Sequence, residues 1–238
     1  MTTKNTPDPF PTGAISPRVL ITAGPTHEPI DEVRYIGNRS SGKLGIELAN
    51  QAANLGWSTT LLLGPSCHSP SSPKVSTKRF GSVADLQELL SDHLAECDVL
   101  VMAAAVADYT PESPTAKGKL RRSETDGLTI RLKPTPDMLA GCCSVSRPDQ
   151  LMVGFALEPR EQLLETARSK LERKGADIVV ANPLETMEAG DIEATIIASP
   201  VLQDHEQNTD GKLSKADFAE WLMPKLLQAW VAKRNNKG

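Results

Sequence analysis

Three stretches of the sequence carry residue types that could bind and activate a phosphate-containing ligand. The first is Ser40-Ser41-Gly42-Lys43, which opens a segment with leucine at helical spacing, beyond Gly24 at the end of an apolar run. Backbone N–H groups and the positive dipole end at a helix start favour an anion. The run has neither the GxGxxG nor the GxxxxGK[ST] spacing, so an ordinary serine-rich helix cap explains these residues equally well. Both interpretations stay open on these residues alone.

Lys170 and Lys174 form the second stretch, four residues apart in a segment, 160–174, with helical periodicity. Its apolar stripe consists of Leu163, Leu164, Ala167 and Leu171. At roughly 100° per residue, Lys174 falls inside this stripe and Lys170 at its edge. Two neighbouring cations repel each other unless an anion lies between them, and a polyphosphate would supply it. The alternative is that the aliphatic stems pack while the ammonium groups reach water.

The third stretch is the basic sequence KGKLRR at 117–122, within a polar segment, 109–127. A basic, glycine-containing loop beside a strand end could close over phosphates as a lid, although a charge run is more often a solvated face. Asp108 follows an alanine-rich run, where it could accept a hydrogen bond from a base or a ribose, or simply form a turn. No metal-ligand spacing relates the four histidines His27, His68, His93 and His205.

The elements that must position these residues alternate between strand and helix. Buried-strand patterns occupy 18–24, 58–63 and 98–105, with a turn-rich stretch at 25–39. One amphipathic helix is expected to open at 40–43 and to stop at Gly56, and a second is expected at 82–94. This alternation predicts right-handed βαβ units, and therefore a Rossmann-like α/β fold with a mostly parallel sheet and helices on both faces. Ligands bind beyond the carboxyl ends of the strands in such a sheet, where Gly24 and Asp108 fall.

The regular alternation ends near residue 109. We expect an alternating strand at 128–132, a short helix capped by Asp137, and strands at 151–156, 177–181 and 193–198, the last of these closing the series. Ser214 and Asp217 predict a capping box for the last helix, in which Pro224 should cause a kink or a break. The sequence thus predicts a disordered leader at 1–17 and a single domain at 18–238, with a lid insertion at about 109–132.

Composition excludes several classes of function. The 238 residues contain 26 Lys plus Arg and 30 Asp plus Glu, and a net charge of −4 argues against a general nucleic-acid surface. The longest unbroken apolar run, 99–107, is too short for a membrane helix, which needs about 20 residues. The four cysteines have no CxxC spacing and the N-terminus has no signal-peptide core, so we expect reduced thiols and a cytoplasmic location.

The segment 21–45, ITAGPTHEPIDEVRYIGNRSSGKLG, resembles the N-terminal signature of phosphopantothenoylcysteine synthetase. This enzyme is the ligase half of the bacterial bifunctional coenzyme A biosynthesis flavoprotein. Further similar blocks follow in the family's order at 103–109 (AAAVADY), 119–122 (KLRR), 133–139 (KPTPDML), 153–158 (VGFALE) and 174–182 (KGADIVVAN). Ordered agreement over several blocks is more specific than any single motif.

The resemblance implies a CTP-dependent phosphopantothenate–cysteine ligase. In that reaction the carboxylate of 4′-phosphopantothenate attacks CTP, which gives an acyl-cytidylate and pyrophosphate, and the amine of cysteine then displaces CMP. Because a carboxylate and a triphosphate repel each other, Mg²⁺ and lysine side chains must neutralise the phosphates. The residues that hold the Mg²⁺ are not identified by the resemblance.

The resemblance also implies roles for individual residues. Lys119 corresponds to the lid lysine that acts in acyl-cytidylate formation and contacts CTP, and Asn38 to the asparagine that contacts the intermediate and supports its conversion. Asp108 and the backbone at Ala103 and Ala104 match the strand end that recognises cytosine. The remaining CTP contacts would be Pro136, Asp137, Met138, Leu139, Phe155, Lys170 and Lys174.

A homodimer is implied as well, with the 128–132 strand contributing to the interface. Only a short segment precedes the first expected strand, so we expect no FMN, and decarboxylation by a separate flavin enzyme. One rival hypothesis is a nicotinamide-dependent oxidoreductase. Two observations argue against it: the first strand–helix turn lacks GxGxxG, and no acidic residue ends the 58–63 strand. Another is a non-catalytic partner of a flavin decarboxylase. ATP in place of CTP also stays open.

Overall fold

The computed structural model describes residues 16–113, 118–120, 127–186, 190–202 and 206–235. Its centre is a sheet with the strand order β13-β12-β10-β9-β6-β1-β4-β5. Six neighbouring strands are parallel: β5 (Val75–Arg79), β4 (Ser58–Leu63), β1 (Arg18–Ala23), β6 (Val99–Met102), β9 (Leu151–Glu158) and β10 (Ile178–Pro183). This order is that of a Rossmann-type sheet, which reverses between β1 and β6, and it confirms the predicted α/β class.

Short antiparallel strands complete one edge of the sheet. β12 (Thr195–Ala198) pairs with β10, and β13 (Glu206–Asn208) pairs with β12. The prediction that the 193–198 strand is the last one was wrong, because β13 and β14 (Leu213–Ser214) follow it. β14 pairs with β11 (Asp191–Ile192) outside the main sheet. These strands have two or three mostly polar residues, so they lack the apolar alternation by which a strand is recognised.

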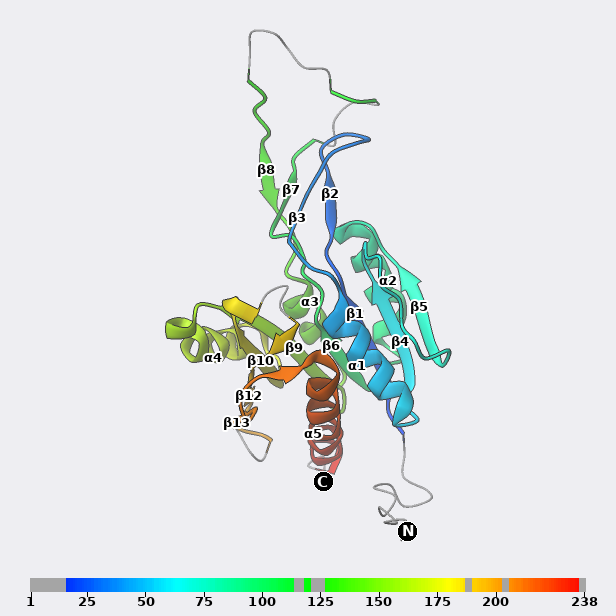
Figure 1. Cartoon of the computed structure of the whole chain (residues 1–238), viewed down its shortest axis with the longest axis vertical. Coiled ribbons are helices and arrows are strands. Elements are labelled where there is room, and N and C mark those ends of the chain that lie inside the picture. The colour runs from blue at the N-terminus through cyan, green and yellow to red at the C-terminus, as the bar shows by residue number, and fades with distance from the viewer. Residues whose placement is uncertain (1–15, 114–117, 121–126, 187–189, 203–205, 236–238) are drawn as a thin grey trace.

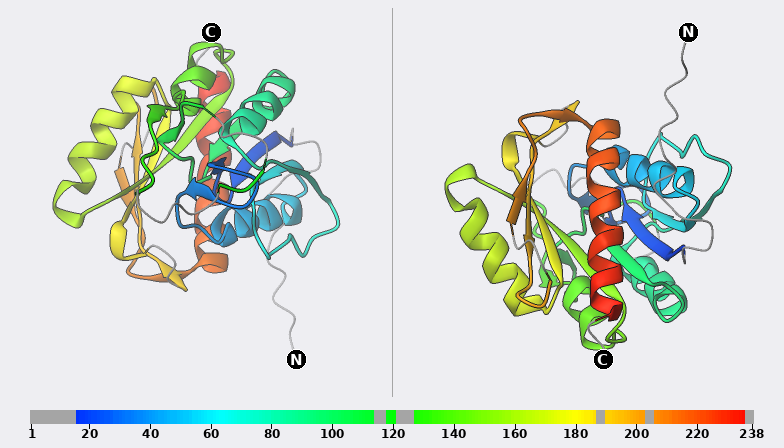
Figure 2. Two further views of the ribbon diagram at one scale, coloured as in Figure 1. Left: turned by 90° about the horizontal axis from the view of Figure 1, so that it is seen from above. Right: turned by 90° about the horizontal axis from the view of Figure 1, so that it is seen from below.

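Helices cover both faces of the sheet (Figure 2). One face carries α1 (Lys43–Asn54) and α5 (Lys215–Asn235), and the other carries α2 (Val83–Leu94), α3 (Met138–Ser144) and α4 (Leu163–Lys174). Successive side chains of β1 point to opposite faces of the sheet. Ile21 packs in the core beneath α1 and α5, and Leu20 packs in the core beneath α2. None of the helices in the described ranges combines the length and the apolar character that crossing a bilayer requires.

Glycines allow α1 to lie unusually close to β1. A Cβ atom at Gly45 would lie 2.5 Å from the Cβ of Ala23, and one at Gly42 would lie 3.3 Å from the Cα of Gly24. Gly42 is also the N-cap of α1 and has a φ of 73°, which side-chain-bearing residues rarely adopt. The start of α1 is therefore held directly against the carboxyl end of β1.

Two expectations for the helices need correction. Of the kink or break expected at Pro224, the break does not occur, because α5 continues from Lys215 to Asn235. The helix is held by the buried side chains Phe218, Leu222, Leu226 and Trp230, whose burial outweighs the loss of one backbone hydrogen bond. Leu164 is 37% exposed and so lies outside the apolar stripe of α4. The first turn of the expected 160–174 helix is the 3₁₀ helix η1 (Arg160–Gln162).

Two antiparallel hairpins project from the same side of the body (Figure 1). One pairs β2 (His27–Pro29) with β3 (Tyr35–Gly37), and the other pairs β7 (Tyr109–Pro111) with β8 (Leu132–Pro134). We call the described parts of 27–37 and 109–134 the arm. The expected lid insertion falls within it, but the expected 128–132 strand is reduced to β8, because 127–131 has no regular secondary structure.

A few predicted features fall beyond the described ranges. They are residues 1–15 of the predicted leader, Lys117, Arg121 and Arg122 of the basic loop, and His205. A second 3₁₀ helix, η2 (Leu184–Thr186), follows β10 directly.

The close contact between α1 and β1 predicts that Gly45→Ala destabilises the protein. The added methyl group would lie 2.5 Å from Ala23 and 3.2 Å from the carbonyl oxygen of Thr22, so α1 must shift outward. We expect a loss of about 1–3 kcal/mol in the free energy of unfolding, measured by urea titration. The matched control is Gly141→Ala in α3, where no atom lies within 4 Å and a gain of about 0.5–1 kcal/mol is expected. Equal effects of the two variants would contradict this account.

Candidate active site

The loop that follows β6 forms the rim of the site and is fixed from within the core. The backbone N–H of Ala104 donates to Oγ1 of Thr22 at 3.1 Å, and that of Ala107 donates to Oγ1 of Thr26 at 2.9 Å. Both threonines are fully buried. Because these hydroxyl groups already hold the loop, its backbone is in place before a ligand binds.

A cavity of about 580 Å³ opens at the carboxyl ends of β6 and β9, beneath the arm. This volume lies within the range of ordinary ligand sites. Ten of the residues predicted for catalysis or CTP binding line it: Asn38, Ala104, Asp108, Pro136, Asp137, Met138, Leu139, Phe155, Lys170 and Lys174. Segments far apart in the sequence thus converge on one cavity.

A smaller cavity of about 200 Å³ adjoins the larger one at the start of α1. The two share the lining residues Arg39, Ala104, Ala105, Phe155 and Leu157. The predicted phosphate-binding residues Ser40, Ser41, Gly42 and Lys43 line the smaller cavity, together with Ala103 and, from α5, Lys215. The N-cap, Gly42, has no side chain to offer, but Oγ of Ser41 accepts the backbone N–H of Lys43 at 3.4 Å.

The two cavities differ in the charge of their linings. The larger one has three cationic residues and three acidic ones, Arg39, Lys170, Lys174, Asp108, Asp137 and Glu158. The smaller one has the cations Arg39, Lys43 and Lys215, and no acidic residue among the described residues that line it. A ligand with a neutral part and a highly charged part would therefore be oriented by this pair of cavities.

Lys170 lies in an unusual electrostatic position. Its Nζ donates a hydrogen bond to the carbonyl oxygen of Phe155. Burial, assisted by the charge of Lys174, lowers the pKa of Lys170 to about 8. Glu158 and Asp137 act in the opposite direction, but their influence on the pKa is smaller. Lys170 therefore loses its proton more readily than an ordinary lysine, and a bound anion would stabilise its ammonium form.

Lys174 is paired with Asp137. The Nζ of Lys174 lies 3.1 Å from a carboxylate oxygen of Asp137, which is also the predicted N-cap of α3 and accepts the N–H of Ala140 at 3.1 Å. Burial opposes ionisation of Asp137, but these hydrogen bonds outweigh it and lower its pKa. The predicted lysine pair thus lies in one cavity, with one member already neutralised by an acid.

Asn38 is oriented by a single hydrogen bond. Its Nδ2 donates to the carbonyl oxygen of Val106 at 2.8 Å, across from the end of β3 to the loop after β6. Because a carbonyl can only accept, the amide nitrogen must face Val106. The carbonyl oxygen of the Asn38 side chain is consequently the atom left to accept a hydrogen bond from a ligand.

Two predicted residues lie outside both cavities. Gly24 lies behind the smaller cavity, where its φ of 82° and its contact with Gly42 shape the β1–α1 turn. Lys119 is exposed on the arm, and neither cavity has it in its lining. Lys119 is therefore not among the described residues that line the cavities where the other predicted residues gather.

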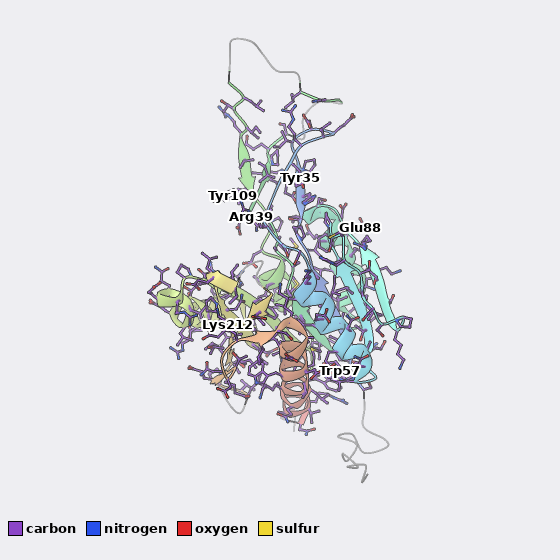
Figure 3. The ribbon with its side chains drawn as sticks, in the orientation of Figure 1. Tyr35, Arg39, Trp57, Glu88, Tyr109 and Lys212 are labelled. Atoms are coloured by element: carbon purple, nitrogen blue, oxygen red, sulfur yellow. The ribbon has the colours of Figure 1, made fainter. Side chains whose placement is uncertain are left out.

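Reasoning from the sequence missed Arg39, which lines both cavities (Figure 3 shows it where the arm joins the body). It follows Asn38 directly, so its position in the motif was a signal that could have identified it. Thr22, in β1, and Thr26, between β1 and β2, were missed because nothing in the sequence distinguishes a buried threonine that binds a loop from one that only packs in the core. Lys215, which begins α5, was missed because only folding brings the last helix beside the first.

The larger cavity suits a Mg²⁺ ion that arrives with a triphosphate. Among the described residues, no three His, Cys, Asp or Glu side chains gather to hold a metal ion on their own. Mg²⁺ needs only one or two protein carboxylates when phosphates supply its other ligands, and the carboxylate of Glu158 lines the cavity. Bound there, Mg²⁺ would neutralise phosphate charge.

Two curated relatives are similar to the chain over most of its length. One, from an unidentified prokaryote, is named cysteine/cysteine sulfinic acid decarboxylase and is 44% identical over 73% of the chain and 47% of its own length. The other is the coenzyme A biosynthesis bifunctional protein CoaBC of Mycolicibacterium smegmatis, 37% identical over 78% of the chain and 47% of its own. The chain thus spans about half the length of these relatives.

A solved structure of the C-terminal domain of a CoaBC protein covers 93% of the chain and 97% of its own length, with 30% identity and a TM-score of 0.73. The family described as the DNA/pantothenate metabolism flavoprotein C-terminal domain matches residues 15–229. Taken with the Rossmann-type strand order, these matches show that the chain belongs to the family of the DNA/pantothenate metabolism flavoprotein C-terminal domain.

Proposed function

We propose that the protein is a phosphopantothenate–cysteine ligase that uses CTP. The observation that carries this proposal is the pair of adjoining cavities, which gathers residues from five distant sequence blocks and offers a charge-balanced part beside a purely cationic part. A nucleoside and the phosphates nearest to it fit the first, beside Lys170, and the rest of the polyphosphate fits the second. The name of the CoaBC relatives, coenzyme A biosynthesis, agrees with this assignment.

The reaction has two steps. A carboxylate oxygen of 4′-phosphopantothenate attacks the α-phosphorus of CTP, the bond from that phosphorus to the bridging oxygen breaks, and pyrophosphate leaves. The amine of cysteine then attacks the acyl carbon of the acyl-cytidylate, the bond from that carbon to the phosphate oxygen breaks, and CMP leaves as the amine loses a proton. The first step brings two anions together, so it depends on cations that surround the phosphates.

In the first step, Lys170, Lys43 and Arg39 would reduce the negative charge of the triphosphate, and Asp108 and the backbone after β6 would contact the base. The triphosphate would also restore the full charge of Lys170, since a nearby anion favours the ammonium form. In the second step, the side-chain oxygen of Asn38 would accept a hydrogen bond from the attacking amine. Its hydrogen bond to Val106 fixes the direction of that oxygen.

The proposal includes a homodimer in which the arm of one copy supplies Lys119 to the cavity of the other. Lys119 is exposed on an arm that projects from the body (Figure 1). Eleven large apolar side chains are exposed in the described part of the chain, and five of them lie on the arm: Val33, Tyr35, Tyr109, Leu128 and Leu132. Because exposed apolar side chains gathered in one region favour burial against another surface, we propose that a second copy of the chain covers the arm.

The direct test is a pyrophosphate assay with CTP, Mg²⁺ and 4′-phosphopantothenate, followed by addition of cysteine and detection of CMP. We expect pyrophosphate before cysteine is added and phosphopantothenoylcysteine afterwards. Replacing CTP by ATP in a parallel assay decides the base preference. No pyrophosphate with any nucleoside triphosphate, or an enhanced NADH fluorescence on mixing, would remove the ligase assignment.

Lys170 predicts that CTP binding weakens as the pH rises above 8. Arg173, Lys174, Glu158 and Asp137 set its environment, and its lowered pKa means that it loses its charge between pH 7 and 9. Phosphate groups are already fully ionised there, because their last pKa is near 6. We expect kcat/KM for CTP to fall by roughly tenfold between pH 7 and 9 because of this deprotonation.

The control for this pH profile is Lys170→Arg, whose guanidinium group stays charged over the whole range. Its profile should be flat between pH 7 and 9 apart from effects shared with the wild type. A wild-type profile as flat as that of Lys170→Arg would show that Lys170 does not contribute charge to CTP binding.

Supply of Lys119 by the second copy predicts complementation between two inactive variants. Lys119→Ala has an intact cavity, and Lys170→Met has an intact arm. When the two are co-expressed with different tags, half of the dimers are mixed, and each mixed dimer has one complete site. Activity should recover to about one quarter of that of the wild type. If Lys119 serves its own cavity, the mixture will be as inactive as the two variants alone.

A further inference from the structure

Asp31, between β2 and β3, is buried although it lies on the projecting arm. Its side chain is 0% exposed. Oδ1 accepts the backbone N–H groups of Val33 and Arg34, at 2.8 and 2.7 Å, which closes the hairpin turn. Oδ2 accepts the N–H of Leu120 at 3.0 Å, 89 residues away in the sequence. Asp31 therefore joins the β2–β3 hairpin to the segment that follows β7.

Arg34 reinforces the same junction. Its NH2 group lies 2.9 Å from Oδ2 of Asp31 and donates to the carbonyl oxygen of Leu120 at 2.6 Å. An isolated arginine–carboxylate pair prefers two parallel hydrogen bonds. Here one nitrogen serves both acceptors, and Nε of Arg34 is buried with no partner in the described part of the chain. Leaving this N–H without a partner costs free energy, which a side chain oriented only for the ion pair would avoid. The orientation of Arg34 is therefore set by its hydrogen bond to the backbone of Leu120.

Both hydrogen-bonding groups of Leu120, N–H and C=O, are thus held by one acidic and one basic side chain. Lys119 is the residue before Leu120, and it is exposed. We infer that Asp31 is a positioning residue for Lys119: through the backbone of Leu120 it fixes where the ammonium group of Lys119 is presented. This inference rests on the proposed function, in which Lys119 acts on the triphosphate.

The chemistry of the clamp suits this role. A hydrogen bond from a backbone N–H to a charged carboxylate is stronger than one to a neutral acceptor. The hydrogen bonds from Val33, Leu120 and Arg34 outweigh the effect of burial and lower the pKa of Asp31, so the carboxylate stays charged at neutral pH. Catalytic rates respond steeply to displacement of a reacting group, by about 100-fold for 1 Å.

The test compares Asp31→Asn with the wild type in the release of pyrophosphate before cysteine is added. The amide is nearly the same size but carries no charge, so the hold on Leu120 is weakened. We expect kcat for this step to fall by about 10- to 100-fold, while KM for CTP stays within about twofold, because the cavities are untouched. The control is Asp85→Asn, a carboxylate that also accepts backbone N–H groups, at the start of α2, and that should leave the step unchanged.

A double-mutant cycle separates positioning from a general loss of stability. In the Lys119→Ala background, Asp31→Asn should change the residual rate by less than about twofold, because the group it positions is already absent. Equal proportional losses in both backgrounds would mean that Asp31 acts independently of Lys119, and would overturn the inference. A wild-type rate for Asp31→Asn alone would overturn it as well.

Two further measurements complement these: the first uses a variant other than Asp31→Asn, and the second has a readout other than activity. Leu120→Pro removes the N–H that Asp31 accepts, and it also replaces the leucine side chain and restricts the backbone of Lys119. It should lower kcat at least as much as Asp31→Asn, and a wild-type kcat would contradict the clamp. Hydrogen exchange at the amide of Leu120 should be slow in the wild type and fast in Asp31→Asn, and equal rates would show that no clamp exists. If the wild type released no pyrophosphate, the proposed function would fail while the exchange result still decided the clamp.

Discussion

The hydrogen bonds that the loop after β6 donates to two buried threonines, Thr22 in β1 and Thr26 just after it, are the interaction on which the site depends. The order of the strands reverses between β1 and β6, so the chain leaves these two neighbours in opposite directions and opens a crevice. In the loop after β6, the N–H groups of Ala103 and Ala105 still donate to backbone carbonyl oxygens, those of Thr22 and Gly24, whereas those of Ala104 and Ala107 donate to side chains. Thr22 and the neighbouring Thr26 supply partners from inside the protein, where water cannot compete for them. The small side chains of this alanine-rich loop then let a ligand approach the backbone itself.

The charges around the crevice are arranged around that fixed rim. Lys170 is held where burial disfavours its charge, while Lys174 is already satisfied by Asp137, which in turn caps α3. Attraction for a phosphate group would therefore come chiefly from Lys170 and from the cations at the start of α1, rather than from the two lysines of α4 acting as an equal pair. Asp137 binds both the backbone N–H of Ala140 and the ammonium group of Lys174. Its removal would therefore disturb the start of α3 and leave Lys174 without this acidic partner.

The regular part of the fold was predictable because its side chains alternate in burial. The strand at 58–63 was predicted with its observed limits, and the 82–94 helix to within one residue at each end. The first helix was predicted to open at 40–43 and to stop at Gly56, and α1 runs from Lys43 to Asn54. β5 was missed because four of its five residues are exposed at the edge of the sheet. The β2–β3 hairpin was missed because Tyr35 faces outward and only tertiary contacts bury Asp31. The ordered motif blocks identified most of the cavity lining, whereas the contributions of Arg39 and Lys215 depend on which elements become neighbours.

The arm shows why assembly and chemistry would be linked. A two-stranded ribbon is marginally stable on its own, and this arm consists of two of them with apolar side chains in water. Polar contacts fix its shape: Glu28 accepts the N–H of Val83 at the start of α2, and Asp31 holds Leu120. Such contacts specify a conformation but add little net stability, because water would satisfy the same groups in the unfolded arm. The apolar surface must supply that stability by being covered. If a second copy covers it, the site gains its lysine only in the assembled protein, and the acyl-cytidylate would form only where both copies enclose it.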